Sequence, residues 1–135
     1  MKISLRTIRS NTRAVSVTEF ALIAPLLLTA ILGIGQLGIM FFANAGMRSA
    51  VGEGARFATI FPRPTDNQIK AKVASNRFGI KPQNLSPTVI THGQTDGGDY
   101  VDIQMSYNVP LDFVFFSVPP VRLVATRRAF VQPVV

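Results

Sequence analysis

The sequence predicts an α+β fold, in which a long N-terminal transmembrane α-helix extends into a head with a second short helix and a small antiparallel β-sheet. Two patterns favour this class: an uncharged apolar run from Phe20 to Ala43, and a strict alternation of apolar and polar residues from Val101 to Val109. Hydrophobic residues make up 47% of the 135-residue chain and charged residues only 16%, which is apolar for a soluble protein. We therefore expect part of the chain to lie in lipid and the rest to form one small domain.

The run from Phe20 to Ala43 has the length and composition of a membrane-spanning helix. As an α-helix it is about 36 Å long, enough to cross a hydrocarbon core of about 30 Å with some tilt. Basic residues without an acidic one precede Glu19 (Lys2, Arg6, Arg9 and Arg13). The positive-inside tendency therefore predicts a cytoplasmic N-terminus and places the chain after about Asn44 across the membrane.

Pro25 lies one to two turns into this run, where it removes a backbone N–H group and favours a kink. Proline is also common in membrane helices that have no hinge, so both interpretations stay open. A secretory signal peptide is an alternative to the anchor, because Ala43-Asn44-Ala45 fits a cleavage pattern that would leave Gly46 as the first residue. The apolar run is longer than the usual h-region of about 7 to 15 residues, which favours a retained anchor.

Beyond Ala43 the helical pattern continues to about residue 61, where Phe61-Pro62-Arg63-Pro64 is expected to end the helix. Apolar residues recur on one face (Met47, Val51, Ala58 and Phe61), and Glu53 is placed to pair with Arg56. A row of small residues lets another element approach closely (Gly46, Ala50, Gly54 and Ala58). Packing against this protein's own strands is favoured over a contact with another subunit, which remains the alternative.

A second helix is expected over about residues 66–78. Thr65 and Gln68 have the spacing of a capping box, Ile69 and Val73 lie one turn apart, and Phe78-Gly79 is a plausible stop.

Strands are expected over about residues 87–131. Thr88 to Thr91 is a short candidate, Asp96-Gly97-Gly98 is a turn signal, and the alternating segment from Val101 to Val109 is the clearest strand. Leu123 to Val131 is expected to pair with it in antiparallel fashion. The dense apolar run from Asp112 to Pro120 is read as core, with an exposed patch on the membrane or a partner as the alternative.

The sequence offers little for catalysis or metal binding. The chain has no cysteine and one histidine, His92, which is expected at the surface. Asp96, Asp99 and Asp102 lack an EF-hand pattern, so we expect a solvated hairpin with no metal or other cofactor. The net charge of +7 lies largely in the N-terminal basic segment, and no nucleic-acid motif accompanies the remaining basic residues. We therefore expect no enzyme activity, no nucleic-acid partner and no small-molecule substrate.

Glu19 sits at the edge of an otherwise uncharged helix, where a carboxylate must reach the headgroups or find a cation. A favourable position against the helix dipole is the simple explanation. The surrounding sequence offers another: Arg13-Ala14-Val15-Ser16-Val17-Thr18-Glu19-Phe20 resembles the class III signal of type IV pilins and pseudopilins. The resemblance implies that prepilin peptidase cuts between Ala14 and Val15, which makes Glu19 the fifth residue of the mature chain. Ala14 stands where these families usually have glycine.

The resemblance narrows to the TadE-like pseudopilins of the tight-adherence (Tad, or Flp) pilus system. It is carried by Ala14 to Leu28 and by Glu53-Gly54-Ala55-Arg56-Phe57-Ala58 just beyond the membrane. It implies a leader at residues 1–14, a transmembrane helix at residues 15–45 and an extracytoplasmic, pilin-like head at residues 46–135.

The function implied is that of a minor pseudopilin, anchored in the bacterial inner membrane by a single span and needed to assemble a pilus for adhesion or secretion. Its implied partners are prepilin peptidase, other Tad pilins and pseudopilins, the assembly platform and membrane lipid. The residues implied in processing are Ala14, Val15, Glu19 and Phe20; those implied in helix packing are Glu19, Pro25 and the small-residue row. A membrane-anchored or exported envelope binding protein, not processed as a pilin, is the alternative.

Overall fold

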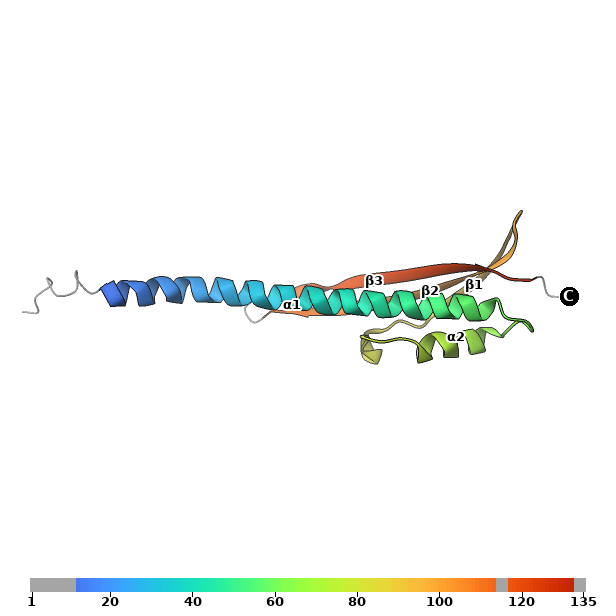
Figure 1. Cartoon of the computed structure of the whole chain (residues 1–135), viewed down its shortest axis with the longest axis horizontal. Coiled ribbons are helices and arrows are strands. Elements are labelled where there is room, and N and C mark those ends of the chain that lie inside the picture. Colours follow the sequence, from blue (N-terminus) through green and yellow to red (C-terminus); the bar gives the residue numbers. More distant parts are fainter. Residues whose placement is uncertain (1–11, 114–116, 133–135) are drawn as a thin grey trace, which may run out of the picture.

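The computed structural model describes residues 12–113 and 117–132 and confirms the α+β class (Figure 1). The elements are α1 (Thr12–Ala58), α2 (Asp66–Ser75), the short 3-10 helix η1 (Pro82–Asn84), β1 (Val89–Thr95), β2 (Gly98–Asp112) and β3 (Ser117–Phe130). The strands form an antiparallel sheet in the order β1-β2-β3. The sheet and α2 lie beside the C-terminal part of α1, and the N-terminal part of α1 projects from this head (Figure 1).

Helix α1 runs without interruption through Pro25 and ends at Ala58. The chain then turns, with the amides of Thr59 and Ile60 donating to the carbonyls of Arg56 and Phe57 at 3.3 and 3.1 Å. The helix thus ends before the Phe61-Pro62 step that was expected to stop it. Phe61 was expected to continue the helical pattern of Met47, Val51 and Ala58, but it lies in the loop beyond the helix and is 82% exposed.

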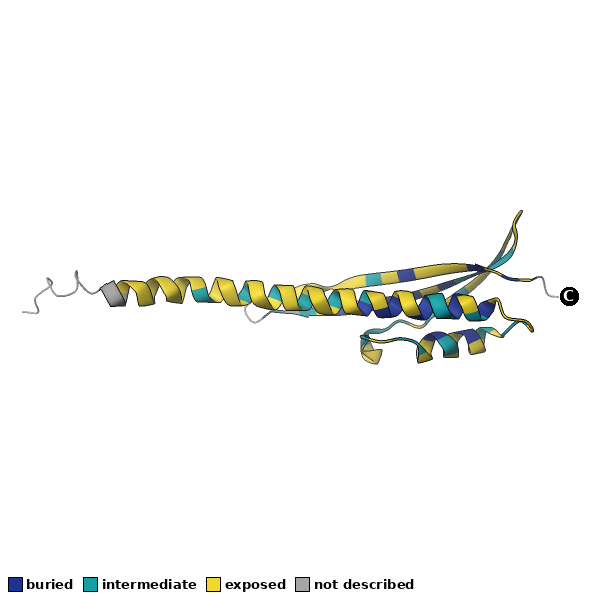
Figure 2. Cartoon of the chain, in the orientation of Figure 1, coloured by how far each residue is buried: buried dark blue, intermediate teal, exposed yellow. Residues whose placement is uncertain are grey.

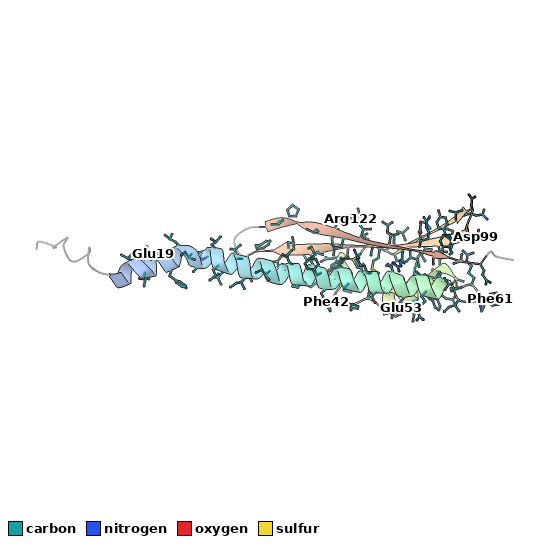
Figure 3. All side chains as sticks on the ribbon, turned by 45° about the horizontal axis from the view of Figure 1, so that its top comes forward. Glu19, Phe42, Glu53, Phe61, Asp99 and Arg122 are labelled. Atoms are coloured by element: carbon teal, nitrogen blue, oxygen red, sulfur yellow. The ribbon has the colours of Figure 1, made fainter. Side chains whose placement is uncertain are left out.

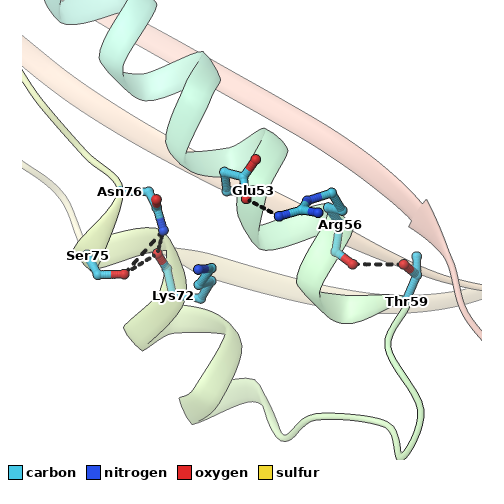
Figure 4. A network of polar contacts seen from close by, with 6 residues as sticks. All are labelled: Glu53, Arg56, Thr59, Lys72, Ser75 and Asn76. Atoms are coloured by element: carbon cyan, nitrogen blue, oxygen red, sulfur yellow. Dashed lines mark hydrogen bonds and ion pairs between the residues drawn. The ribbon is translucent and has the colours of Figure 1, made fainter.

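Helix α2 begins with the expected capping box. The backbone amide of Gln68 donates to Thr65 Oγ1, and the amide of Thr65 donates to Gln68 Oε1 at 2.9 Å. The helix ends at Ser75, earlier than the expected stop at Phe78-Gly79. Ser75 Oγ and Asn76 Nδ2 both donate to the Lys72 carbonyl at 2.9 Å and so satisfy the end of the helix (Figure 4).

The sheet is a meander whose second hairpin is longer than the sequence predicted. Strand β3 begins at Ser117 rather than near Leu123, because Pro119 and Pro120 lie inside the strand instead of ending it. The register shifts between the Val109–Val121 and Leu111–Val118 pairs, so that Pro110 lies opposite the two consecutive prolines in a bulge. Strand β3 is at an edge of the sheet, where proline costs no ladder bond to a further strand.

The core lies between α1, α2 and one face of β2. Alternate residues of β2 are buried there, as the period-two pattern predicted (Val101, Ile103, Met105, Tyr107 and Val109). They meet Met47, Ala50 and Val51 of α1, and Ile69 and Val73 of α2. Burial is concentrated in the C-terminal part of α1, whereas its N-terminal part is exposed (Figure 2).

Candidate functional site

The N-terminal part of α1 is exposed and apolar, and packing within the head does not account for its apolar surface. Large apolar side chains cover it on all sides (among them Phe20, Leu22, Ile23, Leu26, Leu27, Leu28, Ile31 and Ile34). In the described part of the chain, one helical stretch, Val15–Ala58, is long and apolar enough to cross a membrane; its most apolar window has a mean hydropathy of 2.1 and is 6% buried. A soluble domain does not leave such a surface in water.

Glu19 is the acidic residue of this apolar surface, and its side chain is exposed. Helix α1 begins at Thr12, so Glu19 lies beyond the first turn, where the helix dipole has little effect on a carboxylate. In the uncleaved chain, the helix dipole therefore does not explain the position of Glu19. Among the residues whose side chains are described (15–111, 113 and 118–132), no basic side chain forms an ion pair with Glu19.

The junction expected for processing lies at the very start of α1. Ala14 and Val15 are both helical, and the Val15 side chain is exposed. Phe20 follows Glu19 and is 68% exposed. The expected junction residues and Glu19 thus lie at the end of α1 that projects away from the head, and Figure 3 shows Glu19 remote from the packed side chains.

Pro25 interrupts neither the helix nor its exposed surface. Thr29 Oγ1 donates to the Pro25 carbonyl at 2.8 Å, a bond to the preceding turn that satisfies the hydroxyl inside an apolar segment. Gly35 and Gly38 have open space where a Cβ would lie, whereas Gly33 faces the ring of Phe113 at 3.7 Å from that position. These contacts give no sign of a break in the helix at Pro25.

The small-residue row of α1, unlike the apolar N-terminal part of the helix, lies against other parts of the head. Gly46, Ala50, Gly54 and Ala58 are all buried inside this chain. A methyl group on Gly46 would collide with the Phe78 carbonyl, and one on Gly54 would collide with Val73 Cγ2. At Gly46 the row therefore packs against the segment that follows α2, and at Gly54 it packs against Val73 of α2, with Ile103 of the expected sheet 3.5 Å from the Cβ position.

Of the three aspartates singled out in the sequence, Asp102 is engaged in an ion pair on the surface of the head. Asp102 receives two hydrogen bonds from Arg128 at 2.8 and 2.7 Å, which hold the pKa of the Asp102 carboxyl below its ordinary value. Arg128 also stacks 3.8 Å above the Tyr100 ring. Among the described residues, no three acidic, histidine or cysteine side chains are grouped as metal ligands would be.

His92 is at the surface, as expected, but no sequence pattern predicted its partners. Arg63 Nη2 donates to His92 Nδ1 at 3.0 Å, and His92 Nε2 donates to Asp66 Oδ1 at 2.9 Å. Both partners come from the loop before α2 and from its first residue, so this bridge ties α2 to β1. It has the character of a structural contact at the far end of the head.

The expectation for the apolar run of the hairpin was wrong in part. The apolar run from Asp112 to Pro120 was read as core, but Val118, Pro119 and Pro120 are exposed, so that reading was wrong for these residues. Residues 114–116 lie outside the described residues.

In α1, Glu53 and Arg56 do pair, at 3.0 Å, as their spacing predicted (Figure 4).

Comparison with known proteins adds one match. Residues 14–56 match the family model of the TadE-like proteins, and these residues include both the projecting part of α1 and the part that packs in the head. Searches of curated proteins and of solved structures found no significant match. TadE-like proteins are a pilin-like structural family rather than an enzyme family. The part of α1 from Ala14 to Arg56 therefore matches the TadE-like family domain.

Proposed function

We propose that this chain is a minor pseudopilin of a Tad pilus, needed for pilus assembly and used in adhesion or secretion. The observation that carries the proposal is the division of α1 into an apolar, exposed part that bears Glu19 and a part buried in the head, all within the TadE-like domain. Such a helix has one surface for lipid or neighbouring helices and another for its own domain.

In this proposal the protein is anchored in the inner membrane with its N-terminus in the cytoplasm and its head on the other side. The length of the apolar part fits a hydrocarbon core of about 30 Å, and the basic residues that precede it fit the cytoplasmic side. Prepilin peptidase then removes residues 1–14 by cutting between Ala14 and Val15. The new amine of Val15 supplies a positive charge at the start of the mature helix.

Glu19 is the assembly residue in this scheme. Its exposed carboxylate has no cationic partner among the described residues, and a charge at the edge of the lipid is costly unless it is paired. When helices of neighbouring subunits stack, Glu19 of one meets the Val15 amine of another. Other Tad pilins, pseudopilins and the assembly platform are the proposed partners.

The experiment that tests this scheme is the intact mass of the membrane-extracted protein, with and without prepilin peptidase. Peptidase-dependent loss of residues 1–14 is expected. Ala14→Gly should keep cleavage and Ala14→Leu should block it, because a small residue is required before the cut; both variants leave the described contacts of the head unchanged. A chain that starts at Gly46 would instead indicate an exported envelope protein, and an intact Met1 in all samples a simple membrane anchor.

A further inference from the structure

The end of the β2–β3 hairpin reaches far down the apolar part of α1. The ring of Phe113, directly after β2, lies 3.7 Å from the position that a Cβ of Gly33 would take. Gly33 precedes Ala43, the last residue of the apolar run, by about 15 Å of helix. The sheet thus flanks a part of α1 that the sequence assigns to the membrane (Figure 1).

On the helix, this same level is covered with exposed apolar side chains. Those between Gly33 and Ala43 that the hairpin leaves uncovered are Ile34, Leu37, Ile39, Phe41 and Phe42, each at least half exposed. If the bilayer ended at Gly33, all of them would face water. A span from Phe20 to Ile39 is about 30 Å long and keeps most of them in lipid, which places the hairpin end about 9 Å below the outer edge of the hydrocarbon.

The hairpin end has a composition that suits this depth. Val118 and Val121 of β3 are 36% and 37% exposed, and Leu111 pairs with Val118 across the hairpin. Pro110 lies opposite Pro119 and Pro120, so this stretch of exposed strand edge carries fewer N–H groups that would lose their hydrogen bonds in lipid.

Polar and basic groups begin just above this end. Lys81 and Tyr107 line a cavity of about 180 Å³ together with Gln36 and Ile39 of α1, and the Tyr107 hydroxyl accepts a hydrogen bond from the Lys81 amide at 3.4 Å. Arg122 lies level with Phe42 along the long axis (Figure 3). Lysine is typical of the headgroup level, where its apolar stem lies along the hydrocarbon and its charged end reaches water. The Lys81 side chain is exposed.

We propose that the described residues near the end of the β2–β3 hairpin, Leu111 and Phe113 on one side and Val118 to Val121 on the other, insert beside α1 into the outer leaflet of the membrane that α1 spans. The occupant of the exposed surface at Val118 and Val121 is therefore lipid of that leaflet. This inference depends on the proposed membrane span of α1. It implies that the head contacts the membrane through two elements, and that incorporation into a pilus requires withdrawal of the hairpin as well as of the helix.

The chain has no cysteine, so single-cysteine variants can carry an environment-sensitive fluorophore at one known site. We would label Val118→Cys, Val121→Cys and Val124→Cys along β3, with Leu27→Cys as the lipid control and Phe61→Cys as the water control. The full-length protein is reconstituted in phosphatidylcholine–phosphatidylglycerol vesicles. Each probe is then quenched by lipids that carry a nitroxide near the headgroup or at mid-chain, and separately by aqueous iodide.

We expect nitroxide near the headgroup to quench Val118→Cys and Val121→Cys several-fold more strongly than Phe61→Cys, with a weaker effect on Val124→Cys. Leu27→Cys should respond most to the mid-chain nitroxide. Iodide quenching of Val118→Cys equal to that of Phe61→Cys, with Leu27→Cys protected, would overturn the hairpin insertion and leave the span intact. Iodide quenching of Leu27→Cys as well would overturn the membrane span itself.

Discussion

The backbone of Phe78 lies directly against Gly46 of α1, so closely that no side chain fits between them. The Phe78 ring also packs on Phe42 with a centroid separation of 5.2 Å. Gly79, which has a φ of +67°, faces the same Phe42 ring. The segment after α2 is thereby fixed to α1 at the level where the exposed and buried parts of the helix meet.

Gly46→Ala is therefore expected to destabilise the head by about 1 to 3 kcal/mol, because the added methyl group overlaps the Phe78 carbonyl. Gly52→Ala is the matched control: it lies in the same helix with open space around it, and should stabilise the head by about 0.5 to 1 kcal/mol. The two tyrosines of the chain, Tyr100 and Tyr107, both lie in β2, and there is no tryptophan. Thermal unfolding followed by tyrosine fluorescence in detergent thus reports the head. Equal effects of the two substitutions would contradict the close contact at Gly46.

Gly54 supports α2 in a similar way. A Cβ on Gly54 would overlap Val73 Cγ2 and come within 3.5 Å of Ile103 Cδ1. We expect Gly54→Ala to cost about 1 to 3 kcal/mol. Val73→Ala alone also destabilises, since Val73 is fully buried. The double variant should be less destabilised than the sum of the two, because Val73→Ala makes room for the new methyl group. Additive losses in the same unfolding measurement would argue against direct packing of these two positions.

Local signals in the sequence were sufficient for most of the elements. The capping box of Thr65 and Gln68, the alternation along β2 and the apolar run of α1 are each satisfied by residues close in the chain, so their patterns predict the elements directly. The start of β3 was missed because proline usually ends a strand. Here Pro119 and Pro120 are accommodated by an edge position and by Pro110 across the bulge, which only the pairing of the strands reveals.

Contacts between segments that are distant in the chain could not be predicted from local sequence patterns. The small-residue row indicated a close approach at Gly46 and Gly54, but nothing in the sequence identified α2 and Phe78 as the approaching groups. The bridge from His92 to Arg63 and Asp66 joins residues that are distant in the chain. The depth reached by the hairpin depends on the length of β3, so it was missed together with the start of that strand.

The pair of Asp102 and Arg128 should make part of the head's stability depend on pH. The hydrogen bonds from Arg128 lower the pKa of Asp102 below its ordinary value of 3.8, so the folded state binds fewer protons there than the unfolded state. The contribution is present above pH 3.8 and is lost as the pH falls through the lowered pKa. The effect should be small, because both side chains are partly exposed.

Asp102→Asn should accordingly lower the unfolding temperature slightly at neutral pH, and the difference from the unaltered protein should shrink on acidification below pH 3.8. Asp96→Asn in the exposed turn between β1 and β2 is the control, and should show no such convergence. The measurement is tyrosine-monitored melting over a pH series. A difference between the Asp102→Asn variant and the unaltered protein that stays constant from neutral to acid pH would show that the ion pair contributes nothing to stability.

Substitution of Glu19 should separate membrane insertion from assembly. Glu19→Gln keeps the size and polarity of the side chain but removes its charge, and the residue contacts nothing in the head, so insertion and head stability should be unchanged. In a low-dielectric helix bundle, loss of one partner of the pair with the Val15 amine should cost roughly 3 to 5 kcal/mol, enough to abolish incorporation into a pilus. Sheared pilus fractions and membrane fractions of the same cells, probed for this protein, give the measurement. Glu19→Asp should retain part of the incorporation because it keeps the charge. Normal incorporation of Glu19→Gln would exclude a charge pair at this position, since the amide carries no negative charge to meet the amine.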